Sequence, residues 1–355
     1  MNMDINHLTH EATDLLIKMV SIPSVSREEK EVADFLEKVL SDYGLNPHRN
    51  GHNIWSICPT YDPSKPTLLL NAHIDTVKPT SSWTISPFSP VIEDGKLYGL
   101  GTNDDGASVV SLLQVYRQII QSPQQYNIVF LASCEEEVSG KNGIEQVLPL
   151  LPHIDVALVG EPTGMQPAIA EKGLMVIDVT AHGKSGHAAR NEGENAIYKA
   201  LDDIQWFRQF HFDKESPLLG PVKMSVTIIQ AGTQHNVIPD QCKFTVDVRS
   251  NEFYSNEEIF KIICNHIQGE AQARSFRLNS SHITEDHPLV KRAIELGRIP
   301  FGSPTLSDQA LMKFPSLKMG PGQSSRSHTA NEYIELNEIK EAITLYYNIL
   351  NGLVL

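Results

Sequence analysis

Cysteine is scarce in this chain and widely scattered. The 355 residues contain four cysteines, at positions 58, 134, 242 and 264, and no CxxC pair. A disulfide framework or a thiolate zinc site is therefore not expected, and a reducing compartment fits this usage. The N-terminus also lacks the basic start and the clean apolar run of a signal peptide. We therefore expect a cytoplasmic protein.

Long hydrophobic runs and an excess of positive charge are missing as well. No stretch approaches the roughly 20 apolar residues of a membrane span. The formal net charge of −14 argues against binding to nucleic acid or to an anionic membrane surface. Hydrophobic residues make up 41% of the chain and charged residues 20%, which is typical of a globular protein. The length is sufficient for two domains.

The first half of the chain alternates between helical and strand patterns. Residues 26–40 carry apolar side chains at helical spacing, after a possible capping box of Ser26 and Glu29. An apolar helix is predicted at 106–120. Apolar runs without alternation predict buried strands at 66–75, 126–133 and 154–162. Buried strands separated by helices indicate an α/β domain with a mixed, largely parallel sheet covered by helices.

The pattern changes near Gly173. Alternating or short strands are predicted at 173–183, 223–232, 241–250 and 273–280, and helices at 193–210 and 255–267. The resulting order βαββαβ is typical of a ferredoxin-like α+β domain. Because α/β character returns at about residue 283, we expect this domain to be an insertion. The predicted domains are residues 1–172 with 283–355, and the inserted residues 173–282.

Histidine and carboxylate side chains gather where the predicted strands end. His73 and Asp75 lie two residues apart after a buried strand, so their side chains share one face. Three adjacent acids, residues 135–137, follow the next strand. Such a cluster is costly to bury unless a cation neutralises it. Ligands of open α/β sheets bind outside the carboxyl ends of the strands.

Each of these signals has a plain structural alternative. An isolated His-x-Asp is more often a hydrogen-bonded pair, and an Asp before a helix, such as Asp104 or Asp105, is more often its cap. Glu161 could also cap a helix, and His328 could be a surface histidine. Together, however, these histidines and carboxylates suit divalent zinc, cobalt or manganese. One carboxylate could bridge two ions about 3.5–4 Å apart.

Several short strings resemble those of the M20 metallopeptidase family. They are "HIDTV", "GTNDDGA", "EEEVSG", "GEPT", "GKSGHAA", "GTQHNVIP", and "GPG" followed by "SHTANEYI". They cover essentially the whole chain in the family's order. The resemblance implies a two-zinc amidohydrolase, with cobalt or manganese as possible substitutes. It also implies a catalytic domain that is interrupted by a smaller dimerisation domain, and hence a homodimer.

The resemblance also assigns roles to individual residues. One ion would be held by His73, Asp104 and Glu161, and the other by Asp104, Glu137 and His328. Asp75 would orient His73, and Glu136 would be the general base rather than a ligand. Glu135 stands where the family more often has Asp, and is expected to be structural. The peptide bond between Asp104 and Asp105 is expected to be cis.

Residues of the inserted domain would complete the site. His187 matches the family histidine that donates to the oxyanion of the reaction, and in the family it acts from the partner subunit. Asn236 and Arg249 match positions that contact substrate, although Arg249 could equally form a surface ion pair. A guanidinium suits a substrate carboxylate because its donors form a bidentate fork.

The substrate class implied by the resemblance is an N-acyl amino acid. N-acetylornithine is the first expectation, and N-succinylornithine, an N-acylcitrulline, succinyl-diaminopimelate or a dipeptide are alternatives, because one acyl group is a small change in pocket shape. Ser307 and Asp308 stand in a segment that departs from the desuccinylase pattern. A dinucleotide-binding oxidoreductase is disfavoured because "GLGTNDDG" lacks a correctly spaced third glycine. A catalytically dead scaffold would be expected to have lost ligands or the base, and all are present.

Overall fold

The computed structural model describes residues 4–355, and the chain divides into two compact units. The larger unit contains the chain up to Ile169, Ile283–Phe301 and Ser307–Leu355. The smaller unit contains Ala170–His282 and the short segment Gly302–Leu306. The predicted insertion began a few residues later and did not include the returning segment. None of the helices within residues 4–355 is long and apolar enough to cross a membrane.

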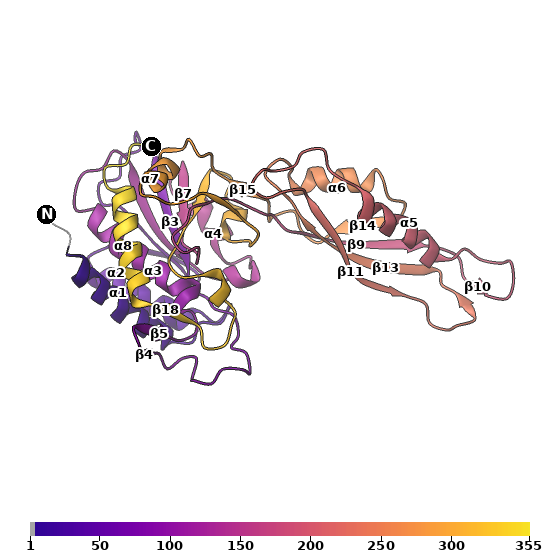
Figure 1. The fold of residues 1–355 in the computed structure, drawn as a ribbon, viewed down its shortest axis with the longest axis horizontal. Helices are drawn as coiled ribbons and strands as arrows, with labels where there is room; N and C mark the ends of the chain where they lie inside the picture. The colour runs from indigo at the N-terminus through magenta and orange to yellow at the C-terminus, as the bar shows by residue number, and fades with distance from the viewer. Residues whose placement is uncertain (1–3) are drawn as a thin grey trace. The chain divides into compact units, whose positions relative to one another are not determined.

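The larger unit is built around a mixed sheet with a parallel centre (Figure 1). Its strand order is β1-β2-β6-β3-β7-β17-β8, in which β8 and its partner β16 cross the boundary of the unit, whereas β15 belongs to the smaller unit. Strand β3 pairs in parallel with β6 and β7, and β17 pairs in parallel with β7. The bounds are β1 (Pro47–Asn50), β2 (Asn53–Ile57), β3 (Thr67–His73), β6 (Asn127–Ser133), β7 (Val156–Val159), β8 (Ala168–Glu171), β15 (Ser281–His282), β16 (Phe301–Ser303) and β17 (Ser316–Lys318).

The three central strands are buried along their whole length, which explains their unbroken apolar runs. Every residue of β3, β6 and β7 is buried. Such strands need helices or loops on both faces of the sheet. One core cluster includes residues of α1 (Ile5–Val20), α2 (Lys30–Asp42), α3 (Ala107–Ile119), α7 (Pro288–Glu295) and α8 (Leu336–Leu350). A second cluster includes residues of α4 (Ile144–Val147).

Helix α2 begins later than its sequence suggested. It starts after Glu29, which makes no side-chain cap hydrogen bond, so the predicted capping box of Ser26 and Glu29 is wrong. The Ser26 hydroxyl instead donates to the Asp75 carboxylate, at 2.7 Å. Glu29 is fully buried and accepts from the backbone N–H groups of Arg27 and Glu135. Both polar side chains are thus used by tertiary contacts rather than by the helix.

Short elements surround the strand ends of the larger unit. A three-stranded antiparallel sheet joins β4 (Val91–Glu93), β5 (Lys96–Tyr98) and β18 (Tyr333–Glu335). The irregular π-helical turn η1 (Thr102–Gly106) leads into α3. The remaining single turns are η2 (Glu136–Val138), η3 (Leu148–Leu150), η4 (Asp308–Leu311) and η5 (Ser324–Arg326). Turns η1 and η2 carry three of the acids discussed below, Asp104, Glu136 and Glu137.

The smaller unit has a four-stranded antiparallel sheet with the order β11-β13-β9-β14. In chain order its elements are β9 (Met175–His182), α5 (Ala196–Gln209), β11 (Lys223–Ala231), β13 (Gln241–Arg249), α6 (Asn256–Cys264) and β14 (Glu270–Ala273). This is the predicted βαββαβ order. Burial alternates along β9, with one face in a core that includes residues of both helices. The predicted α/β fold with a separate small antiparallel domain is therefore confirmed.

Two details of the smaller unit differ from expectation. Strand β14 lies at Glu270–Ala273, earlier than the strand predicted at 273–280. The Arg274 side chain makes two hydrogen bonds to Asp178. A separate two-stranded ribbon, β10 (Gly186–His187) with β12 (Val237–Ile238), joins segments that flank α5 and β13 in sequence.

Candidate metal centre

His73 ends the buried strand β3 and is fixed in one orientation. Its Nδ1 lies 2.9 Å from the backbone oxygen of Asp75, which can only accept a hydrogen bond. Nδ1 therefore carries a ring proton, and Nε2 is the nitrogen that can offer a lone pair to a metal. Nε2 lies 3.1 Å from Asp104 Oδ1 and 3.9 Å from Glu161 Oε1. Two carboxylates thus face the ring nitrogen that is free to bind a metal.

Asp104 stands between the two histidines of the site. Its peptide bond to Asp105 is cis, as predicted. Oδ1 faces His73 Nε2, and Oδ2 lies 3.7 Å from His328 Nε2. A carboxylate whose two oxygens face two different imidazoles has the arrangement required of a bridging ligand.

His328 and Glu137 form the other side of the site. Their Nε2 and Oε2 atoms lie 2.9 Å apart, although His328 comes from the loop between η5 and β18 and Glu137 from η2. The Glu137 side chain is nearly buried, whereas that of His328 is 57% exposed. The fold therefore brings together residues that are almost two hundred positions apart in the sequence.

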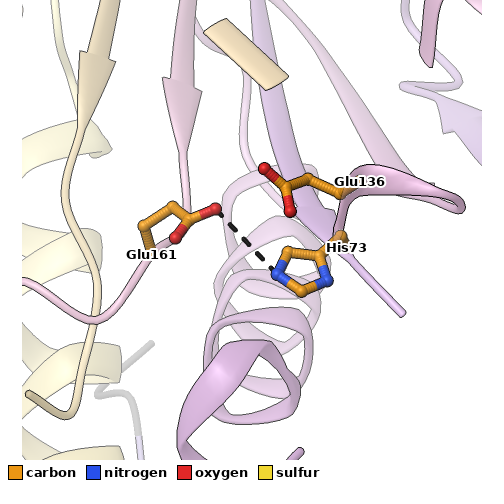
Figure 2. Close-up of side chains that lie close together, drawn as sticks. All are labelled: His73, Glu136 and Glu161. Carbon is orange, nitrogen blue, oxygen red and sulfur yellow. Dashed lines mark ion pairs between the residues drawn. The ribbon is translucent and has the colours of Figure 1, made fainter. Parts of the chain in front are cut away.

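Two overlapping groups of side chains have the spacing of metal ligands. In one, ligand atoms of His73, Glu136 and Glu161 all lie within 4.8 Å of one another (Figure 2). In the other, the same holds for His73, Asp104 and Glu137. Glu136 was predicted to be a base and not a ligand. A base that acts on water between the ions must lie beside the ligands, so its place in the first group fits that role.

The three consecutive acids, residues 135–137, differ in the hydrogen bonds that hold them. The Asp75 carboxylate accepts from the backbone N–H groups of Glu136, at 3.0 Å, and Glu137, at 3.1 Å. Ser26 donates to the same carboxylate. Asp75 therefore orients the His73 ring through its backbone and positions both glutamates through its side chain.

Glu135 points away from the site. Its carboxylate accepts from the Asn142 amide at 2.8 Å, and its backbone has a left-handed conformation with φ 55°. A Cβ at Gly140 would lie 1.9 Å from a Glu135 carboxylate oxygen, so only glycine leaves room for this side chain. The expectation that Glu135 is structural agrees with these contacts.

The electrostatics of the cluster favour a bound cation. Burial raises the pKa of Glu136 well above its usual range, and the carboxylates of Glu161, Asp308 and Glu137 raise it further, against the opposing effect of His73. Burial alone would lower the pKa of His73, but hydrogen bonds to Asp104 and Asp75 raise it well above normal. Carboxylates outnumber positive groups here, and divalent ions would neutralise that excess.

Three residues around the candidate metal centre had little or no signal in the sequence. Asp308 accepts from the Ser133 hydroxyl at 2.7 Å, and its charge raises the pKa of Glu136. The Glu332 side chain is buried and accepts from the backbone N–H groups of Asn103 and Asp104. Burial raises the Glu332 pKa to about 8. The role of Ser26 was hidden by its resemblance to a helix cap.

The remaining predicted residues lie in the smaller unit. His187 and Asn236 are both exposed and adjoin each other in the β10–β12 ribbon, where the Ala188 N–H donates to the Asn236 backbone oxygen at 3.0 Å. Arg249 makes two hydrogen bonds to Asp247, as in the ion-pair alternative. The catalytic role of His187 and the substrate contacts of Asn236 and Arg249 stay predictions.

The fold and the clustered histidines and carboxylates define a metallohydrolase. The sequence model of peptidase family M20/M25/M40 matches residues 69–352, and the chain belongs to this family. The resemblance found in the short motifs is therefore confirmed, and the protein is a metal-dependent hydrolase of the M20 family.

Named relatives cover nearly the whole chain at low identity. A succinyl-diaminopimelate desuccinylase of Wolbachia pipientis wMel is 24% identical over 365 residues, covering 95% of this chain and 92% of the relative. A [LysW]-lysine/[LysW]-ornithine hydrolase of Sulfurisphaera tokodaii is 29% identical over 362 residues, covering 96% and 95%. The solved structure of aminopeptidase PepT from Bacillus cereus aligns with a TM-score of 0.77 at 19% identity, covering 97% and 98%. At this identity, the similarity to the PepT structure shows a shared fold only.

Proposed function

We propose that this protein is a two-metal amidohydrolase that removes the acyl group from an N-acylated amino acid. The observation that carries the proposal is the placement of Asp104, whose two carboxylate oxygens face His73 and His328. The donor set fits the metal, because imidazole nitrogens and carboxylate oxygens are ligands that suit zinc. His73, Asp104 and Glu161 would hold one ion, and Asp104, Glu137 and His328 the other.

The bound ions would supply an activated water and polarise the amide carbonyl. Glu136 would accept the proton of that water and pass it to the departing amine, which is the ordinary path of general-base followed by general-acid catalysis. Its position on η2, held by the Asp75 carboxylate, keeps the Glu136 carboxylate within the group that includes His73 and Glu161. Asp75 would keep His73 in the tautomer that leaves Nε2 free.

The smaller unit would supply the rest of the site. We propose that it forms a homodimer and that His187 of one protomer donates to the oxyanion in the active site of the other. Asn236 adjoins His187 in the same ribbon and would contact substrate beside it. The four cysteines are all free, which supports a reducing, cytoplasmic location.

For the substrate, we propose an amide in which one amine of a diamino acid is acylated. N-acetylornithine remains the first choice from the sequence, whereas the names of relatives point to succinyl-diaminopimelate and to LysW-linked lysine or ornithine. Ornithine, lysine and diaminopimelate share a second amine, and the acyl group is the variable part. Arg249 could recognise a carboxylate of such a substrate.

The test is a hydrolysis screen with zinc-loaded protein. The panel would contain N-acetylornithine, N-succinylornithine, N-acetylcitrulline, succinyl-diaminopimelate and a dipeptide. We expect at least one acylated amino acid to be cleaved, with activity lost to a chelator and restored by zinc or cobalt. Metal analysis that finds no bound ion after careful loading would overturn the two-metal proposal. Cleavage of the dipeptide alone would replace the deacylase proposal with a peptidase.

A further inference from the structure

Two buried polar residues outside the predicted ligand set connect the turn that carries Asp104 to the loop that carries His328. Asn103 is fully buried and Glu332 is 2% exposed. Both belong to the larger unit. We propose that they form a clamp, called here the Asn103–Glu332 clamp, that positions Asp104 and His328 for metal binding. This inference rests on the proposed two-metal site.

The Glu332 end of the clamp holds the backbone of the turn. Glu332 Oε1 accepts from the N–H of Asn103 at 2.8 Å and from the N–H of Asp104 at 2.9 Å. The backbone oxygen of Glu332 accepts from the Gly99 N–H at 3.0 Å. Two donors on one buried carboxylate oxygen fix the peptide from which the Asp104 side chain extends.

The Asn103 end holds the start of the His328 loop. The Asn103 amide oxygen accepts from the Gln323 N–H at 2.9 Å, and its NH₂ donates to the Gln323 carbonyl at 3.1 Å and to Ser327 Oγ at 3.3 Å. Every polar atom of this buried amide is therefore used. The segment 323–332, which contains η5 and the His328 loop, is thus attached to the turn η1 at both of its ends, Gln323 and Glu332.

The close fit around the clamp supports a positioning role. A Cβ at Gly322 would lie 2.3 Å from Asn103 Oδ1, and Gly322 has φ +81°. A side chain there would push the loop away from the Asn103 amide. His328 lies between the two attachment points, and it is more than half exposed. The same loop is also held by the hydrogen bonds between Asn331 and Thr84 and by the Arg326–Glu338 ion pair. The clamp is distinct from these contacts because it attaches the loop directly to the turn that carries Asp104.

The consequence is that metal affinity depends on residues that touch no metal. Outer hydrogen-bond partners of metal ligands typically change metal affinity about 10- to 100-fold when they are removed. We expect Glu332→Ala to weaken the ion held by Asp104, Glu137 and His328 by about that factor. Glu332→Gln should lose less, because its amide oxygen can still accept from both N–H groups. Asn103→Ser should also weaken metal binding.

The experiment measures metal binding without any substrate. Metal-free protein would be titrated with cobalt, followed by its visible spectrum and by competition with a chromophoric chelator. Glu341→Gln is the matched control, since Glu341 lies on α8 and pairs with Arg298 away from the clamp. We expect two tight ions in wild type and in the control. In Glu332→Ala and Asn103→Ser the ion held by His328 should be weakened most, and the other ion less, because Asp104 is a proposed ligand of both.

The double variant adds a second readout. Because both residues act on the same loop, we expect Glu332→Ala combined with Asn103→Ser to lose less affinity than the product of the single losses. Single variants that fold like wild type and bind both ions equally well would overturn the clamp. If Glu332→Ala does not fold, Asn103→Ser decides by the same titration. Wild-type protein that binds no metal would instead overturn the proposed function.

Discussion

The two units place their candidate functional residues in opposite surroundings. In the larger unit, His73 is 2% exposed and the Asp75 side chain is fully buried, and both are held by several hydrogen bonds. In the smaller unit, His187 and Asn236 lie on an exposed two-stranded ribbon. One set of residues is ordered by its own unit. The other set needs something to cover it before it can exclude water from a reaction.

The difference follows from how each sheet is buried. Strands β3 and β6 are covered on both faces, so residues just beyond their ends are surrounded by packed turns whose donors can hold carboxylates. Strand β9 is buried on one face, so polar side chains on its other face remain accessible. Buried like charges need hydrogen bonds or a cation within their own unit, because burial removes them from water. Exposed residues have no such requirement and can contact another molecule.

The largest effect is expected in the larger unit, where a variant of Glu136 distinguishes the proposed general base from the proposed metal ligand beside it. We predict that Glu136→Gln keeps both metal ions but loses turnover about 10²- to 10⁴-fold, because general-base catalysis typically contributes that much. Turnover of the best substrate and metal content would be measured on the same preparation. Nearly normal kcat in this variant would move the base to another residue.

Glu137→Gln provides the matched comparison, one residue away on the same turn. Glu137 Oε2 lies 2.9 Å from His328 Nε2, so it is placed as a ligand. We expect this variant to bind one ion less tightly, with activity that recovers at high zinc concentration. Glu136→Gln should show no such recovery. If both variants respond to zinc in the same way, the division of roles is wrong.

The sequence was most informative where one physical cause dominates. Unbroken apolar runs located the buried parallel strands, and the ends of those strands located His73 and Glu161. His328 in its glycine- and serine-rich loop had only a weak signal of its own as a candidate ligand, and the resemblance to a family gave it a definite role. Glu332 is an acid just before the short strand β18, and nothing in that pattern indicates that its carboxylate is buried.

Other differences between the sequence-based predictions and the structure arise from tertiary contacts. Ser26 and Glu29 have the spacing of a capping box, yet each is used by residues far along the chain, Asp75 and Glu135. The short segment Gly302–Leu306 joins the smaller unit although the surrounding chain does not. Local patterns identify helices and strands, but they do not show which distant partner a polar side chain will find.

A third prediction concerns the exposed ribbon of the smaller unit. We expect His187→Ala to lower kcat about 10²- to 10³-fold, as the loss of one oxyanion donor typically does. Metal content should not change, because none of the predicted ligands lies in this unit. Kinetics and metal analysis of the purified variant would check both statements. A change in metal occupancy would contradict the proposed role.

Complementation tests whether His187 acts across a dimer. His187→Ala and Glu136→Ala protomers would be mixed under conditions that exchange subunits. A mixed dimer contains one site with both residues intact, so part of the activity should return. Mixed dimers that demonstrably form and remain as inactive as their parents would show that His187 acts within its own chain or is structural.

The smallest expected effect distinguishes a substrate contact from a surface ion pair. Arg249 pairs with Asp247, and Arg274 pairs with Asp178, each with a shortest distance of 2.8 Å. Exposed pairs of this kind typically contribute only about 0.2–1 kcal/mol to folding. We therefore expect Arg274→Gln to leave kinetics and stability nearly unchanged.

Arg249→Gln should raise KM about tenfold or more, because a hydrogen bond to a charged group contributes about 1.5–3 kcal/mol. The two variants would be compared in kcat, KM and thermal unfolding under identical conditions. Equal KM values would reduce Arg249 to the same role as Arg274, and the exposed His187–Asn236 ribbon would then be the only part of the smaller unit proposed to meet substrate.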